Sequence, residues 1–242
     1  RLTASAGHTV IPARPALVPL ETKGETAQNL QGLSLKNVKV KIIVDGKKQS
    51  EAFGEMIFTH FGLSGPIILS LSKNAVDALR QNKKVNLSID LKPALDDGKL
   101  EDRLLRELRD NSNKHFDTFL KTLLPGKMVG VFAELVGIPG NKLCHQISSG
   151  ERKKIRLKLK NMDFEISGHR SFDEAIVTAG GVDLREINPR TMASNLIKGL
   201  YIAGELLDID GETGGFNLQA AFSTGWLAGN SAAEYLNKNV FD

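Results

Sequence analysis

The residues whose types and spacing most clearly suggest a binding site lie between positions 200 and 235. A short apolar run, 200–203, ends at Gly204-Glu205, and after an acidic loop the chain restarts at Gly214-Gly215 as a long expected helix. The first N–H groups of a helix lack partners and carry partial positive charge, so such a helix start attracts an anion. Glycine there permits close approach to the backbone. A structural strand-to-helix corner capped by glycine explains the same spacing equally well.

Two other runs match known functional motifs only in part, one a calcium-binding loop and the other a nucleophile elbow. Asp208, Asp210 and Gly211 fit the middle of an EF-hand loop, but the first and twelfth ligand positions are Leu206 and Asn217, which argues against calcium. The run 62–66 is similar to a nucleophile elbow, yet Pro66 stands where the final glycine belongs and no clear helix is expected after it. A hydrolase is therefore not predicted.

No metal site is predicted either. The five histidines are scattered, and Cys144 and His145 are adjacent in sequence, which is a poor spacing for two ligands of one ion. Each is interpreted first as a structural residue.

The run 135–142, centred on Gly137 to Gly140, resembles the hairpin of a helix-hairpin-helix nucleic-acid-binding unit. Backbone N–H groups there could hold a phosphate, and Lys127, Lys142 and the run 152–160 add positive charge. The competing interpretation is a simple helix link beside a solvated basic helix. Nucleic-acid binding is kept as the alternative function.

The elements that position these residues change in character along the chain. Alternating apolar residues predict strands at 35–44, 55–59 and 85–91, with a hairpin turn at Asp45-Gly46, and hence a small antiparallel sheet or barrel. Three short helices are expected next, because apolar residues recur at helical spacing. The apolar residues of the three helices are, in order, Leu100, Leu104, Leu105 and Leu108; Phe116, Phe119, Leu120 and Leu123; and Met128, Val131, Phe132 and Leu135.

A fourth helix, from Ser148 to about Lys160, is favoured because Ser148 and Glu151 have capping-box spacing, although the apolar residues there also alternate like a strand. Strands are expected at 162–166 and 175–179, and a short buried strand at 200–203. The helix after Gly215 carries an apolar face rich in small residues. Gly225 and Gly229 each cost about 1 kcal/mol of helix propensity relative to Ala, which indicates close packing.

The bulk composition indicates a folded globular protein. Hydrophobic residues make up 41% and charged residues 25% of the 242 positions, and no apolar run approaches the roughly 20 residues of a membrane span. The 32 basic residues are nearly matched by 28 acidic ones, which is a weak nucleic-acid signal. With Cys144 as the single cysteine and no leader, a cytoplasmic location without disulfides is expected.

Several longer motifs resemble a bacterial flavoprotein family, the aminoacetone-oxidase-like NAD(P)/FAD-dependent oxidoreductases of the two-dinucleotide-binding-domain superfamily. The resemblance covers nearly the whole chain. It rests on Gly7-His8, on the runs 15–20, 54–66 and 178–182, and above all on the run 199–225, which contains GLYIAGELLDIDGETGGFNLQAAFSTG.

The resemblance implies a mixed α/β and α+β fold in which an insert interrupts a discontinuous, Rossmann-like FAD-binding domain. Residues 1–33 and 171–242 are expected to form the partial FAD-binding domain, and 34–170 the insert. Within the insert, 34–97 and about 161–170 are expected to be barrel-like and 98–160 helical.

The resemblance also implies which residues lie at the flavin. The helix start would stabilise the negative charge that grows on reduced flavin. Phe216 is often Tyr in the family, so a hydroxyl is lost while the ring remains. His60, in a glycine-rich turn that the resemblance places near the flavin domain, is a candidate catalytic residue. The expected cofactor-binding residues are Gly180, Gly181, Gly204, Glu205, Asp208, Thr213, Gly214, Gly215, Phe216, Asn217 and Leu218.

The chain departs from the family pattern at one point that matters for FAD binding. The family begins with a Gly-x-Gly-x-x-Gly turn that holds the FAD pyrophosphate, and that spacing is absent from these 242 residues. The chain is therefore expected to be the C-terminal part of a longer enzyme, inactive alone, unable to retain FAD tightly, and able to self-associate. The complete enzyme would use FAD, with NAD(P)H as a candidate reductant, on a small-molecule substrate.

Overall fold

The computed structural model describes residues 2–239. They form two compact units, one running up to Val18 and resuming at Arg170, the other comprising Pro19–His169. The expected boundary at residue 33 differs from this division. Residues 20–22 are a strand of the second unit, hydrogen-bonded to two of its other strands, so the segment 19–33 belongs with the barrel.

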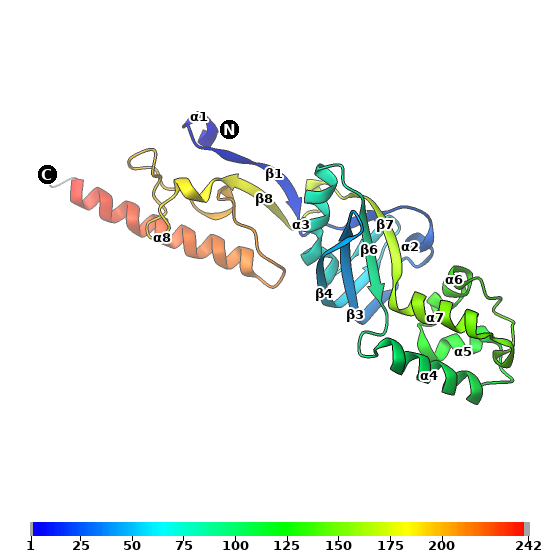
Figure 1. Ribbon diagram of the computed structural model, residues 1–242. Coiled ribbons are helices and arrows are strands. Elements are labelled where there is room, and N and C mark those ends of the chain that lie inside the picture. The colour runs from blue at the N-terminus through cyan, green and yellow to red at the C-terminus, as the bar shows by residue number, and fades with distance from the viewer. Residues whose placement is uncertain (1, 240–242) are drawn as a thin grey trace. The chain divides into compact units, whose positions relative to one another are not determined.

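The second unit contains a closed antiparallel barrel, which confirms the predicted small antiparallel sheet or barrel (Figure 1). Around the barrel the strands follow in the order β2, β5, β4, β3, β6 and β7. Alternate side chains such as Val38, Val40 and Ile42 point into the interior and are fully or almost fully buried. The strands are β2 (Leu20–Thr22), β3 (Ser34–Val44), β4 (Lys47–Phe58), β5 (Gly62–Ser64), β6 (Val85–Asp90) and β7 (Met162–His169).

Two features of the barrel unit escaped the sequence patterns. Strand β4 begins at Lys47, well before the expected start, because its polar first half pairs with β3 while facing solvent. Helix α3 (Pro66–Arg80) does follow the glycine-rich turn, contrary to expectation. Pro66 occupies the first helical turn, where no N–H partner is needed, and Ile68, Leu71 and Ala75 bury one face against the barrel. A short helix α2 (Thr26–Asn29) precedes β3.

All four expected helices of the helical part form. They are α4 (Asp97–Asp110), α5 (Phe116–Leu123), α6 (Gly126–Val136) and α7 (Ser149–Lys160), with a 3₁₀ turn η1 (Cys144–Gln146) before α7. The capping box of Ser148 and Glu151 is present at the start of α7. These helices share one continuous hydrophobic core with the barrel, in which Phe116, Phe119 and Phe132 are fully buried.

The first unit has little sheet. Strands β1 (Val10–Ala16) and β8 (Val177–Val182) form a two-stranded antiparallel sheet, accompanied by α1 (Leu2–Ser5) and the 3₁₀ turns η2 (Phe172–Glu174), η3 (Leu184–Glu186) and η4 (Gly204–Leu206). Within residues 2–239 no Rossmann-like sheet forms. The predicted strand at 200–203 is wrong for these residues, since Tyr201 makes only an isolated bridge with Ala193.

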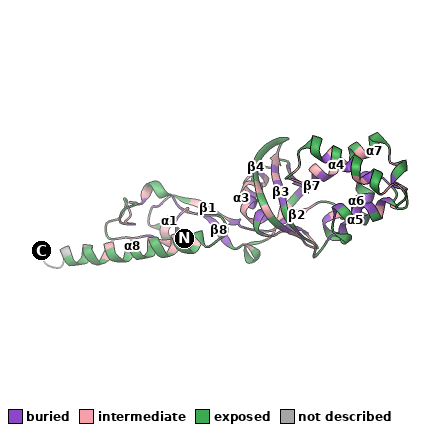
Figure 2. Cartoon of the chain, turned by 90° about the horizontal axis from the view of Figure 1, so that it is seen from below, coloured by how far each residue is buried: buried purple, intermediate pink, exposed green. Residues whose placement is uncertain are grey.

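Helix α8 (Phe216–Asn239) ends the described chain and is largely exposed (Figure 2). Its large apolar side chains face solvent: Leu218, Phe222 and Trp226 are 63%, 70% and 72% exposed. Of the expected apolar face only Ala228 is buried, in a small core with Val182, Ile187, Met192, Ile202 and Leu207. No described helix is long and apolar enough to cross a membrane.

Candidate functional site

The first unit contains a cavity of about 500 Å³ at the start of α8. Six of the expected cofactor-binding residues line it: Glu205, Thr213, Gly214, Gly215, Asn217 and Leu218. Leu17, Ile176, Val177, Glu212 and Ala221 complete the wall. Leu17 lies in the run 15–20 that resembles the family, whereas Ile176 and Val177 belong to no motif; the pairing of β1 with β8 brings these distant residues together here.

The backbone before α8 needs glycine. Gly214 and Gly215 have φ angles of +114° and +89°, in the region that L-residues rarely occupy. A Cβ on Gly214 would lie 3.4 Å from the Phe216 ring, whereas a Cβ on Gly215 would meet nothing within 4 Å. Gly215 therefore leaves open space directly over the exposed backbone at the helix start.

Asn217 holds the acidic loop in place. Its Oδ1 accepts a hydrogen bond from the Gly211 N–H at 2.8 Å, and its Nδ2 donates to the Gly211 and Glu212 carbonyls. Because its amide is committed to this loop, Asn217 shapes the cavity and keeps Glu212 at its wall.

The glycine pair at β8 has a different role from the pair at α8. Gly180 and Gly181 do not line the cavity. A Cβ on Gly180 would lie 2.7 Å from the Pro12 carbonyl oxygen, and one on Gly181 would lie 2.6 Å from the Leu206 carbonyl oxygen. Close packing against β1 and the η4 segment thus explains both glycines without a ligand.

The remaining expected residues do not line the cavity. The Gly204 N–H donates to Thr224 Oγ1 on α8 at 3.0 Å, which ties η4 to the helix. The Asp208 N–H donates to the Val182 carbonyl at 3.0 Å. Phe216 is 64% exposed. His60 belongs to the barrel unit, where it is exposed in the β4–β5 turn and its ring meets Phe61 edge-on at 4.9 Å; its catalytic role stays a prediction.

A buried histidine network in the first unit was missed from sequence. His8 Nδ1 lies 2.9 Å from Glu186 Oε2, and His8 Nε2 lies 3.0 Å from Ser194 Oγ. A carboxylate, an imidazole and a serine hydroxyl follow one another in the same order in the triad of a serine hydrolase. Here, however, Ser194 Oγ already accepts hydrogen bonds from the N–H groups of residues 196 and 197. The network is a turn cap that fastens the N-terminal segment. A hydrogen bond from Thr9, followed by that from His8, lowers the pKa of Glu186.

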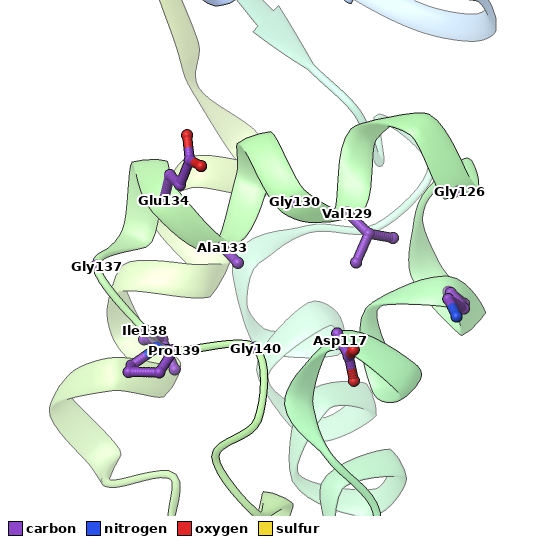
Figure 3. A pocket seen from close by; sticks show the side chains of 11 residues that line it. Asp117, Gly126, Val129, Gly130, Ala133, Glu134, Gly137, Ile138, Pro139 and Gly140 are labelled. Carbon is purple, nitrogen blue, oxygen red and sulfur yellow. The ribbon is translucent and has the colours of Figure 1, made fainter.

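The candidate hairpin at Gly137 to Gly140 borders a groove of about 610 Å³ along α6 (Figure 3). Gly137 ends α6 in the left-handed conformation, and the Gly140 carbonyl accepts the Asp117 N–H at the start of α5. The chain then passes through η1, and α7 begins only at Ser149, so the two helices are not joined directly by the hairpin.

Ion pairs hold much of the positive charge near this hairpin. Lys142 Nζ lies 2.6 Å from Glu151 Oε1, and Arg152 Nε lies 2.5 Å from Glu101 Oε1. Arg156 and Lys160 pair with Asp97 and Asp90. Three further lysines of α7 have no acidic partner within 4 Å in the described part of the chain: Lys153, Lys154 and Lys158. The structure therefore divides the basic run into three ion-paired cations and three lysines without an acidic partner among the described residues.

Comparison with known proteins identifies the family. Residues 14–177 match the barrel and H2TH domain of HI0933-like proteins, so the chain belongs to the HI0933-like family. The chain is 32% identical over 241 residues to a 3-dehydro-bile acid delta(4,6)-reductase of Clostridium scindens, covering 96% of the chain and 57% of that protein.

Two further relatives carry a different name. Ribosomal RNA dihydrouridine synthases of Haemophilus influenzae and Escherichia coli are 31% and 30% identical over 220 residues, which is 91% of the chain and 52% of each relative. The chain thus spans about half the length of the curated relatives it matches.

Proposed function

We propose that the complete protein is an FAD-dependent oxidoreductase that catalyses hydride transfer between a nicotinamide cofactor or oxygen and a small organic substrate. The cavity at the start of α8 carries this proposal, because the six matching residues converge there around an open, glycine-bounded helix start. When bound, FAD would supply the ring that accepts and donates hydride.

The cavity suits the flavin end of the cofactor. Gly215 offers backbone without a side chain at the start of α8, where the helix dipole stabilises negative charge. Leu17, Ile176 and Leu218 provide apolar walls for the flat ring system. Glu205 and Glu212 line the same space, so a ligand there would direct N–H or O–H donors towards their carboxylates.

The substrate proposal follows the reductase relative, which matches over 96% of the chain. That relative is named as a reductase of a 3-dehydro-bile acid. A small, largely apolar substrate is consistent with the apolar walls of the cavity.

RNA is the second candidate substrate. Two relatives are named for a product in ribosomal RNA, and the outer face of α7 presents Lys153, Lys154 and Lys158 without acidic partners among the described residues. Polyanion binding through such lysines would weaken steeply with salt.

The test uses the complete protein. After purification, its bound flavin is identified by absorbance and chromatography, and flavin bleaching by NADH and by NADPH is followed without oxygen. Reoxidation is then measured with small unsaturated ring ketones and with unmodified ribosomal RNA. Protein that never carries flavin would contradict the proposal, and faster reoxidation by RNA than by every ketone would replace the small-molecule substrate with RNA.

A further inference from the structure

A shallow hollow of about 510 Å³ lies in the barrel unit, where the end of α3 meets the end of β7. Arg80, Asn82 and Lys83 contribute from α3 and the turn after it, and Ser167 and His169 contribute from β7. No residue lining the hollow is acidic. Guanidinium, ammonium, amide and hydroxyl groups are all hydrogen-bond donors, so this set matches the acceptor oxygens of an oxyanion.

The two cations of the hollow are available. Arg80 and Lys83 are exposed, and neither has an acidic partner within 4 Å in the described chain. Some other cations of this unit are held by ion pairs, as Lys160 by Asp90 and Arg103 by Glu107. Among the described residues Arg80 and Lys83 take part in no such pair, so both side chains can reach a ligand.

The backbone closes the end of α3 without using these side chains. Asn82 takes the left-handed conformation, with φ of +56°. The N–H groups of residues 81 and 83 donate to the Ala78 carbonyl, and that of Asn82 donates to the Leu79 carbonyl. The carbonyls of Ala78 and Leu79 are thus satisfied by the backbone, so these bonds leave the side chains of Arg80 and Lys83 unused.

We propose that this hollow is a phosphate-binding site, held by Arg80 and Lys83 with Asn82 and Ser167 as neutral donors. The planar guanidinium of an arginine can donate two parallel hydrogen bonds to two oxygens of one phosphate. A carboxylate does lie near the rim, because Glu21 Oε2 is 3.0 Å from the position that a Cβ of Gly168 would take. That charge opposes an anion, so binding of a lone phosphate is expected to be weak and to saturate only at millimolar concentration.

The test is a titration of the ¹⁵N-labelled chain with inorganic phosphate at low ionic strength, followed by NMR. Saturable shifts are expected for the amides of residues 80–83 and 167–169. The double variant Arg80→Gln/Lys83→Gln should bind about tenfold more weakly or not at all. Lys153→Gln/Lys154→Gln removes the same charge from α7 and should bind like the parent chain. Circular dichroism verifies that both variants fold.

A second titration separates the two sources of phosphate. A short oligouridylate without terminal phosphate presents only phosphodiesters. Tighter binding of the oligomer than of inorganic phosphate, abolished by Arg80→Gln/Lys83→Gln, would identify a nucleic-acid backbone as the ligand, whereas binding of inorganic phosphate alone would identify a small phosphate-bearing molecule. Shifts that never saturate, or that weaken equally in both double variants, would overturn the site. Neither result depends on flavin.

Discussion

Replacing Gly215 with Val tests whether the start of α8 lies against the flavin. Gly215 has a φ of +89°, which costs a residue with a side chain about 1–2 kcal/mol, and somewhat more for a β-branched one. Because a Cβ there meets nothing within 4 Å, no clash adds to this within the chain. A ligand packed against the backbone would meet the new side chain, and such overpacking costs about 1–3 kcal/mol, or roughly 5- to 150-fold in affinity.

The matched control is Gly46→Val in the β3–β4 turn. Gly46 has a φ of +78° and likewise open space, so the backbone cost of a side chain is similar, but Gly46 does not line the cavity at the start of α8. Both variants of the complete protein are purified, and the ratio of flavin to protein and the FAD dissociation constant are measured. Both should lose similar stability in urea, while only Gly215→Val should lose flavin. Equal flavin content in the two variants would refute the placement.

Three further outcomes are expected. Lys142, followed by the Ser148 N–H, lowers the pKa of Glu151 from 4.5 to about 2. Glu151→Gln should therefore reduce the free energy of unfolding by about 1 kcal/mol at pH 7, since the carboxylate is partly solvated, and this difference should vanish as the pH falls from about 4.5 to about 2. A difference that persists in urea titrations at pH 2 would disprove the linkage. The chain of 242 residues should bind FAD weakly in a fluorescence titration, and a dissociation constant well below micromolar would show that the pyrophosphate turn is dispensable. Limited proteolysis should cut first near residues 18–19 and 169–170, and early cuts throughout 19–169 would contradict a compact barrel unit.

Local patterns predicted those elements whose partners lie nearby in the chain. The alternation in β3 and the capping box of α7 each identify an element that the structure contains. The first half of β4 was missed because both of its faces are partly exposed, so pairing with β3 determines it and hydrophobic alternation does not. The run 200–203 looks like a buried strand, yet its neighbours among the described residues supply only one bridge.

In the candidate site too, local motifs predicted some residues, while others reach the site only through long-range pairing. Gly214, Gly215 and Asn217 belong to one motif, and sequence could place them together. Leu17, in the run 15–20, and Ile176, in no motif, were not predicted for the site, since the β1–β8 pairing brings them to the cavity. Gly180 and Gly181 match the family motif, but backbone crowding accounts for them.

The pairing of β1 with β8 constrains the order of folding. These strands lie on either side of the entire barrel unit in sequence, so pairing them first would close a loop on the order of 150 residues. Once the barrel has formed, its ends are already neighbours, because Leu20 pairs with His169. The effective loop then shrinks to a few residues, which saves about 3 kcal/mol of closure entropy. The barrel should thus act as the folding template for the discontinuous unit, and barrel mutations that slow its formation should delay β1–β8 pairing by the same factor.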